Sequence, residues 1–116
     1  MPFVNIIRNT KVVTDARLAD IVKSLPSVVA DALTCTEGVL TPEDIAVKVT
    51  DSGPFDRNLK DLEISITARD YPERSADKDN RTKNISRRIH EITPHGMSWS
   101  VCLILVKMAY VSDSEG

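Results

Sequence analysis

The stretch Met1-Pro2-Phe3-Val4-Asn5-Ile6-Ile7 decides the fold, because it places a strand at the very start of a chain of 116 residues. Its apolar content predicts a short, mostly buried strand over residues 2–8. A proline fits the first position of a strand, where its missing N–H costs nothing. Initiator methionine is normally removed before so small a residue, so we also expect a free secondary amine at Pro2. Two roles for Pro2 follow: the opening residue of a strand, or an N-terminal base.

The length and charge restrict the class of protein. A chain of 116 residues fits one domain, over residues 1–116, with a single core. The net charge of −2, with both signs interspersed, argues against a nucleic-acid binder or a basic membrane-surface protein. No segment approaches the roughly 20 apolar residues of a membrane span, and there is no signal peptide pattern. We expect a cytoplasmic protein with no nucleic-acid or membrane partner.

Cysteines and histidines are few and poorly spaced for chemistry. Cys35 and Cys102 form neither a CxxC pair nor a zinc spacing with His90 and His95. We therefore expect no metal and no cofactor. Both cysteines are interpreted as small buried hydrophobic residues, in preference to a disulfide or a nucleophile.

The first helix is predicted over residues 15–33. Thr14 can cap its N-terminus, and apolar residues recur along it at helical spacing. Pro26 lies inside this segment, where it removes one backbone hydrogen bond. The sequence therefore predicts either a kink near Ser24 or Leu25, or two helices in tandem.

The remaining elements follow from alternation and turn residues. Residues 51–54 are a strong turn, and the segment from there to residue 58 is expected to be the most mobile loop. Ser75 and Asp77 are candidate caps for the second helix. The predicted elements are strands over 44–50, 59–69 and 98–107, a helix over 75–92 and a possible short strand over 108–111.

This order, strand–helix–strand twice, predicts an α+β fold built from two βαβ units. Such units can form one four-stranded mixed sheet with both helices on one face, or a ferredoxin-like sheet. The first arrangement has to cover its other sheet face by forming an oligomer. The strand over 98–107 is apolar on both faces, which is typical of a central or interfacial strand.

Three features together resemble the tautomerase superfamily. They are Pro2 directly ahead of the first strand, the segment Thr41-Pro42-Glu43-Asp44-Ile45-Ala46-Val47-Lys48-Val49 after the first helix, and Arg74-Ser75 at the second helix. The middle segment is similar to macrophage migration inhibitory factor. The segment Val106-Lys107-Met108-Ala109-Tyr110 is similar to a group of small bacterial members.

The resemblance implies a homotrimeric isomerase in which Pro2 is the general base for a small oxo-acid or enol. An apolar or cationic site lowers the pKa of an N-terminal amine, so that a neutral base is present at pH 7. The chemistry also needs a cation facing the developing enolate. Arg69, Arg74 and Lys107 are the candidate substrate-binding residues, each with the alternative of a solvated surface charge. A non-catalytic homotrimer or a ferredoxin-like ligand-binding module is the alternative function.

The chain departs from the family pattern at several positions. The lysine that the cytokine-like members carry before their second strand falls at Leu40, and the strand arginine of the oxo-acid tautomerases falls at Ala46. The tyrosine expected on the fourth strand falls at Cys102, or at Trp99 if the register shifts. Pro2 is therefore retained while the residues that hold the substrate differ, so the sequence leaves the identity of the substrate open.

Overall fold

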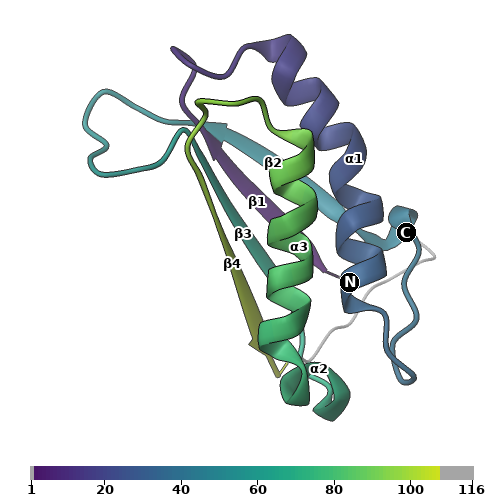
Figure 1. The fold of residues 1–116 in the computed structure, drawn as a ribbon. Helices are drawn as coiled ribbons and strands as arrows, with labels where there is room; N and C mark the ends of the chain where they lie inside the picture. Colours follow the sequence, from purple (N-terminus) through teal and green to yellow (C-terminus); the bar gives the residue numbers. More distant parts are fainter. Residues whose placement is uncertain (1, 108–116) are drawn as a thin grey trace, which may run out of the picture.

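The computed structural model describes residues 2–107, which form one four-stranded sheet and its helices (Figure 1). The predicted strand over 108–111 lies outside the described residues. Within residues 2–107, no helix combines the length and apolar content needed to cross a membrane. The elements are β1 (Phe3–Arg8), α1 (Asp15–Leu33), η1 (Pro42–Asp44), β2 (Ala46–Asp51), β3 (Leu62–Arg69), α2 (Pro72–Ala76), α3 (Lys78–Ile92) and β4 (Trp99–Val106).

The sheet has the order β2-β1-β3-β4 and is built from two parallel pairs. β1 pairs with β2 and β3 pairs with β4 in parallel, while β1 and β3 are antiparallel and join the halves. Each parallel pair is one complete βαβ unit with adjacent strands. A ferredoxin-like sheet would instead split each unit. The predicted α+β fold with two βαβ units is confirmed, and the ferredoxin-like alternative is excluded.

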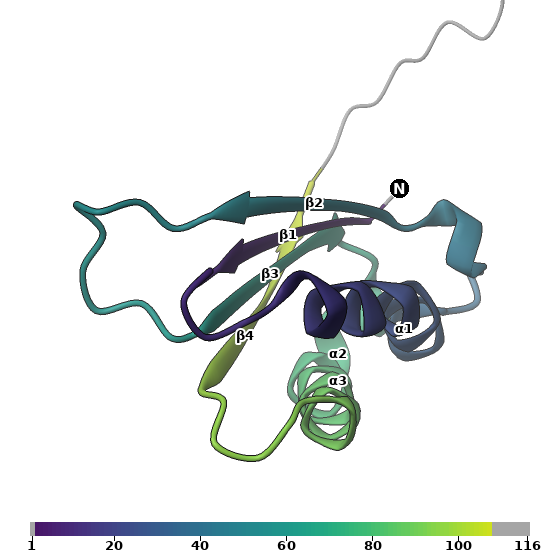
Figure 2. The ribbon, with the colours of Figure 1, turned by 90° about the horizontal axis from the view of Figure 1, so that it is seen from above.

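The helices α1, α2 and α3 lie on one face of the sheet (Figure 2). Alternate residues of β1 and β3 point toward them and are buried, as the period-2 pattern requires. α1 contributes a continuous buried stripe, and α3 contributes only Ile85 and Ile89. The core is therefore formed mainly by β1, β3 and α1.

The opposite face of the sheet is open in the single chain. Phe3 of β1 is 43% exposed and Ile104 of β4 is 42% exposed. Between them in the same cross-strand row lies Thr67, and the next row contains Ser65 beside Cys102. This face is a mixture of apolar and small polar side chains.

The second helix differs from its prediction. The chain forms α2 from Pro72 and then α3 from Lys78, with Asp77 between them at φ −121°. Pro72 occupies the first turn, where its fixed φ suits a helix start and its missing N–H is not needed. The Ser75 hydroxyl donates to Asp70 and does not cap the helix. Asp77 precedes α3 but makes no side-chain cap bond to it.

Five smaller predictions are also corrected or restricted to one of their alternatives. α1 is one helix through Pro26, so two tandem helices are excluded. β2 begins at Ala46 because residues 42–44 form a 3₁₀ turn, and β3 begins only at Leu62. β4 is an edge strand, which excludes the central position and leaves the interfacial alternative. Cys102 is exposed on the open sheet face, whereas Cys35 is buried as predicted.

One contact joins the two βαβ units at the C-terminal end of α1. Arg74 of α2 donates from Nε to the Leu33 carbonyl at 2.7 Å, and Arg81 of α3 donates to the carbonyls of Ala32 and Thr34 at 3.0 and 2.9 Å. These carbonyls belong to the last turn of a helix, which lacks intrahelical partners. The second unit therefore caps the helix of the first.

The loop that follows α1 packs closely against this contact. Cys35 and Gly38 exchange two backbone hydrogen bonds of 3.1 Å, and the Gly38 carbonyl accepts from Nη2 of Arg74 at 3.3 Å. A Cβ atom added to Gly38 would lie 2.7 Å from Cε2 of Tyr71 and 3.0 Å from Nη2 of Arg74. Only glycine allows the loop to approach so closely.

We expect Gly38→Ala to lower the free energy of unfolding by about 1–3 kcal/mol, the usual cost of overpacking a tight contact. Chemical denaturation with urea measures this change. Gly53→Ala is the matched control, since its Cβ would meet only Oδ2 of Asp56, at 3.8 Å. Equal stability of the two variants would contradict this prediction, since it would show that the residues around Gly38 can move to accept a Cβ atom without loss of stability.

Arg8 organises the other end of the sheet. Its Nε donates to Asp51 at 2.8 Å and its Nη1 to Asp15, so that the ends of β1 and β2 are tied to the start of α1. The hydrogen bond from Arg8 lowers the pKa of Asp51 below its ordinary value of 3.8. The Ser100 hydroxyl likewise lowers the pKa of Glu63 below 4.5.

A carboxylate with a lowered pKa stabilises the folded state at neutral pH, and this contribution is lost as pH falls through the folded pKa. We therefore expect the free energy of unfolding to decrease as pH falls below about 4.5 and then 3.8. Asp51→Asn and Glu63→Gln should each make this decrease shallower in denaturation curves recorded between pH 6 and pH 3. Both carboxylates are partly solvated, which limits the size of the effect. Identical pH dependence in all three proteins would contradict the assignment.

Candidate active site

The candidate site lies where β1 begins and where β3 and β4 end. Pro2 is buried, and its carbonyl accepts from the Ala46 N–H at 3.1 Å. Phe3 is paired with Thr67 in the antiparallel register, so Pro2 comes beside Ala68, one residue before Arg69. Pro2 thus stands at the same end of the sheet as the last residue of β3.

Two of the predicted cations reach this end as well. Arg69 is the last residue of β3 and pairs with Val106, and Lys107 follows directly after β4. The Asp70 N–H donates to the Val106 carbonyl at 2.8 Å, which keeps the two strand ends together. Arg69 and Lys107 are both exposed. The structure therefore brings Pro2, Arg69 and Lys107 to the same end of the sheet.

Within residues 2–107, no carboxylate forms an ion pair with Arg69. Among residues 2–107, the ion pairs involve Arg8, Arg81 and Arg88. The neighbouring Asp70 accepts from the Ser75 hydroxyl. Arg69 is thus available for an anionic group that approaches from solvent.

Arg74 lies in a different environment. Its side chain is only 2% exposed, and it donates to the backbone carbonyls of Leu33, Arg69 and Gly38. The hydrogen bond to the Arg69 carbonyl is 2.9 Å long. Three of its five N–H groups are thus used by the protein backbone. Arg74 thus lies in α2 and supports the end of β3 through the Arg69 carbonyl.

Sequence reasoning did not single out Tyr71, which lies between these two arginines. The Cζ atom of Arg69 is 5.1 Å from the centre of its ring, and that of Arg74 is 4.8 Å away. Both distances are within the range of a cation–π contact. The available signal was the spacing Arg69-Asp70-Tyr71-Pro72-Glu73-Arg74, in which one aromatic residue follows one arginine and precedes another on a tight turn.

The positions at which the family pattern fails are not all near the site. Ala46 pairs with Phe3 and so adjoins Pro2, where it offers only a methyl group. Cys102 pairs with Ser65 at mid-sheet. Trp99 pairs with Leu62 at the far end, and its side chain packs against the core beside His90, with ring centres 6.4 Å apart. Trp99 is therefore too far along β4 to serve this site.

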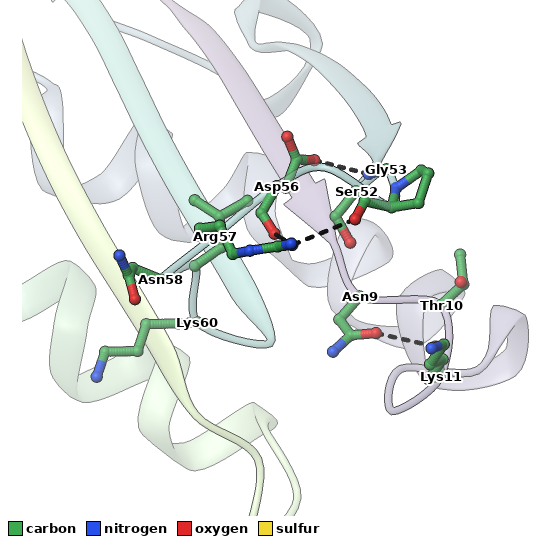
Figure 3. Close-up of a pocket in the computed structure, with 11 residues that line it drawn as sticks. Asn9, Thr10, Lys11, Ser52, Gly53, Asp56, Arg57, Asn58 and Lys60 are labelled. Carbon is green, nitrogen blue, oxygen red and sulfur yellow. Dashed lines mark hydrogen bonds between the residues drawn. The ribbon is translucent and has the colours of Figure 1, made fainter.

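A pocket of about 480 Å³ lies at the opposite end of the sheet (Figure 3). It is formed by the turn after β1 and the loop between β2 and β3, with Lys11, Arg57 and Lys60 among its lining residues. Nη1 of Arg57 is held by the carbonyls of Pro54 and Asp56. The Lys60 side chain extends away from the turn that carries Lys11. These cations do not converge on one point, and none of them adjoins Pro2.

The described residues contain no cluster suited to a metal. Within residues 2–107, no three His, Cys, Asp or Glu side chains gather closely enough to hold an ion. The groups available at the Pro2 end are a backbone nitrogen, cations and an aromatic ring. Such a set can hold an anion, and removal of Met1 would add a basic amine at Pro2.

Sequence comparison gives no relative for the chain. No protein-family model matches it, and no curated protein sequence does.

Solved structures, in contrast, match over nearly the whole chain. Malonate semialdehyde decarboxylase, solved as wild type, as a mutant with alanine in place of its first-position proline and in inactivated form, has a TM-score of 0.66 at 17% identity, with 98% of this chain and 92% of that chain covered. A fused 4-OT symmetric trimer has a TM-score of 0.65 at 11% identity, with 98% and 93% covered. The macrophage migration inhibitory factor-like protein of Entamoeba histolytica has a TM-score of 0.59 at 12% identity, with 91% and 89% covered. The fold of this chain is therefore the fold of the tautomerase superfamily, as the resemblance in its sequence implied.

Proposed function

We propose that the chain is a tautomerase-like isomerase in which Pro2, freed by removal of Met1, is the general base for a small oxo-acid or enol. The observation that carries the proposal is the register of the sheet, which brings Pro2 beside the end of β3 where Arg69 stands. The similar fold of malonate semialdehyde decarboxylase, of which a first-position proline mutant was solved, supports this assignment.

The reaction moves one proton between carbon and oxygen. The neutral Pro2 nitrogen takes a proton from the carbon next to a carbonyl, and the electrons of that C–H bond form the C=C bond of an enolate. The prolinium then returns the proton to the oxygen, and the reverse sequence converts the enol to the ketone. In this proposal, an apolar site or a nearby cation such as Arg69 would favour the neutral amine.

Arg69 holds the acidic end of the substrate in this proposal. Its charge is free of protein carboxylates within the described residues and faces solvent. Lys107, at the end of the neighbouring strand, can contribute a second charge. Arg74 is assigned a supporting role, since its donors bind backbone carbonyls.

The homotrimer is the second part of the proposal. Phe3 and Ile104 leave apolar surface on the open face of the sheet, and burying it in an assembly is favourable. Structures with this fold include trimeric 4-OT assemblies. A closed ring of three chains would cover the same face of each chain.

The alternative is a homotrimer without catalysis. Ala46 supplies no charge beside Pro2, although the resemblance implies an arginine at this position in the oxo-acid tautomerases. A site with a base and too few cations could bind a small ligand without turning it over. The variants below separate the two functions.

We expect Pro2→Ala to slow the enol-to-keto conversion of an arylpyruvate by about 10²- to 10⁴-fold, the usual contribution of a positioned base. The change replaces the secondary amine by a primary amine of different shape and basicity. The pH profile of wild-type turnover should rise through a value below the roughly 8 of a free α-amine. Steady-state kinetics between pH 5 and pH 9 measures both effects.

Pro54→Ala, in the loop between β2 and β3, is the matched control and should leave turnover unchanged. Intact mass spectrometry shows whether Met1 is absent from the purified protein. Retention of Met1, or equal turnover by wild type and Pro2→Ala, would contradict the isomerase and favour the non-catalytic homotrimer.

We expect the wild-type chain to elute as a homotrimer in size-exclusion chromatography with light scattering. Ile104→Arg places a charge on the open sheet face and should shift the protein toward smaller species. Val39→Arg is the control, because Val39 is 73% exposed in the loop after α1 and should leave the assembly intact. A stable wild-type monomer would contradict the trimer.

A further inference from the structure

The ring of Tyr71 contacts one exposed and one buried guanidinium. The Cζ atom of Arg69 lies 5.1 Å from the ring centre, and that of Arg74 lies 4.8 Å from it. Arg69 is exposed, whereas Arg74 is 2% exposed. One member of this stack is thus fixed in the protein, and the other is available to a ligand.

Arg74, the buried member, is held in place by three hydrogen bonds. Arg74 donates to the carbonyls of Leu33, Arg69 and Gly38 at 2.7, 2.9 and 3.3 Å. These three carbonyls belong to α1, to the end of β3 and to the loop after α1, so a shift of the guanidinium would break hydrogen bonds to three separate segments. Arg74 therefore provides a rigid surface for one contact of the Tyr71 ring.

The edge of the ring is held as well. The backbone at Gly38 approaches Tyr71 so closely that an added Cβ would lie 2.7 Å from Cε2 and 3.3 Å from Cδ2. The loop carrying Gly38 is itself tied to α2, because the Thr36 N–H donates to Oε2 of Glu73 at 2.7 Å. Tyr71 is thus confined by Arg74 and by the loop after α1.

A long, exposed arginine samples many rotamers, and ordering it when a ligand binds costs affinity. An aromatic ring that is already fixed reduces this cost, since the cation–π contact favours one orientation of the guanidinium before the ligand arrives. The Arg69 carbonyl accepts a hydrogen bond from the same Arg74. Arg74 therefore orders the backbone of Arg69, and the Tyr71 ring orders its side chain.

We propose that Tyr71 is a positioning residue that orients the Arg69 guanidinium toward the acidic group of the substrate. This inference rests on the proposed function for the role of Arg69. The ordering of Arg69 by Tyr71 is a property of the free protein and can be measured without substrate. The aromatic ring, and not the hydroxyl, is the group required.

Tyr71→Leu and Tyr71→Phe form the test pair. The phenylalanine variant keeps the ring, and the leucine variant removes it. ¹⁵N relaxation of the Arg69 Nε–Hε group, assigned by its loss in Arg69→Lys, measures side-chain order in the free protein. We expect a restricted Arg69 signal in wild type and Tyr71→Phe, and a mobile one in Tyr71→Leu. An equally ordered Arg69 in the leucine variant overturns the inference.

Kinetics on the arylpyruvate gives the second readout. We expect Tyr71→Leu to raise KM by about 3- to 10-fold, which corresponds to about 0.7–1.4 kcal/mol, with kcat nearly unchanged. Tyr71→Phe should match wild type. In an Arg69→Ala background, Tyr71→Leu should have no further effect on KM. A loss of kcat and KM together, or an undiminished effect without Arg69, would show that Tyr71 acts on the fold and not through Arg69.

The two proposals fail in different ways. If wild type and Pro2→Ala turn over equally, the proposed function fails, while the relaxation measurement still decides whether Tyr71 orders Arg69. If Pro2→Ala is slow and Tyr71→Leu has the KM of wild type, the isomerase stands and the positioning role is overturned. Thermal unfolding of each variant identifies any loss of folded protein at the assay temperature.

Discussion

The hydrogen bonds from Arg74 and Arg81 to the end of α1 join the helices of the two βαβ units. α1 has no basic residue in its own last turn, although the carbonyls of a helix end need donors and favour positive charge. The second unit supplies both, and a hydrogen bond to a charged group contributes about 1.5–3 kcal/mol. Because Arg74 also donates to the Arg69 carbonyl, the cap of a helix and the end of β3 share one side chain. The position of Arg69 in the candidate site therefore depends on a contact that also stabilises the fold.

Much of the fold followed from the sequence because burial in a sheet imposes period 2. The alternation of apolar and polar residues predicted a strand over residues 59–69, and β3 buries every second residue from Leu62 to Ala68. The break at Asp77 could not be predicted, since the polar segment after it carries no signal that separates one helix from two. The position of β4 was also inaccessible: a strand with apolar residues on both faces is equally consistent with a central strand and with an edge strand of an open face. Cys102 was placed wrongly for the same reason.

The candidate site was predictable in its parts and not in its arrangement. Pro2 and Arg69 were identifiable as chemistry-bearing residues, but only the antiparallel register of β1 with β3 puts them at one end of the sheet. The burial of Arg74 was unpredictable, because an arginine is ordinarily exposed and its partners here are backbone carbonyls of residues 33, 38 and 69. The sequence does not indicate which backbone carbonyls will lie within hydrogen-bonding distance of an arginine. Tyr71 became meaningful only once both guanidinium groups were located.

The register of the sheet also determines how the chain can fold. Phe3 pairs with Ala46, Leu62 pairs with Trp99, and Arg8 pairs with Leu62 across the middle. Within residues 2–107 the sheet therefore contains no hairpin. Each strand pair has to close a long loop before any ladder hydrogen bond forms, and the entropy of that closure is lost before contacts compensate for it. α1 and α3 are the local structures that can form first. Helices that pack early would shorten the distance between strand partners, and the sheet would then be the last part of the molecule to be completed.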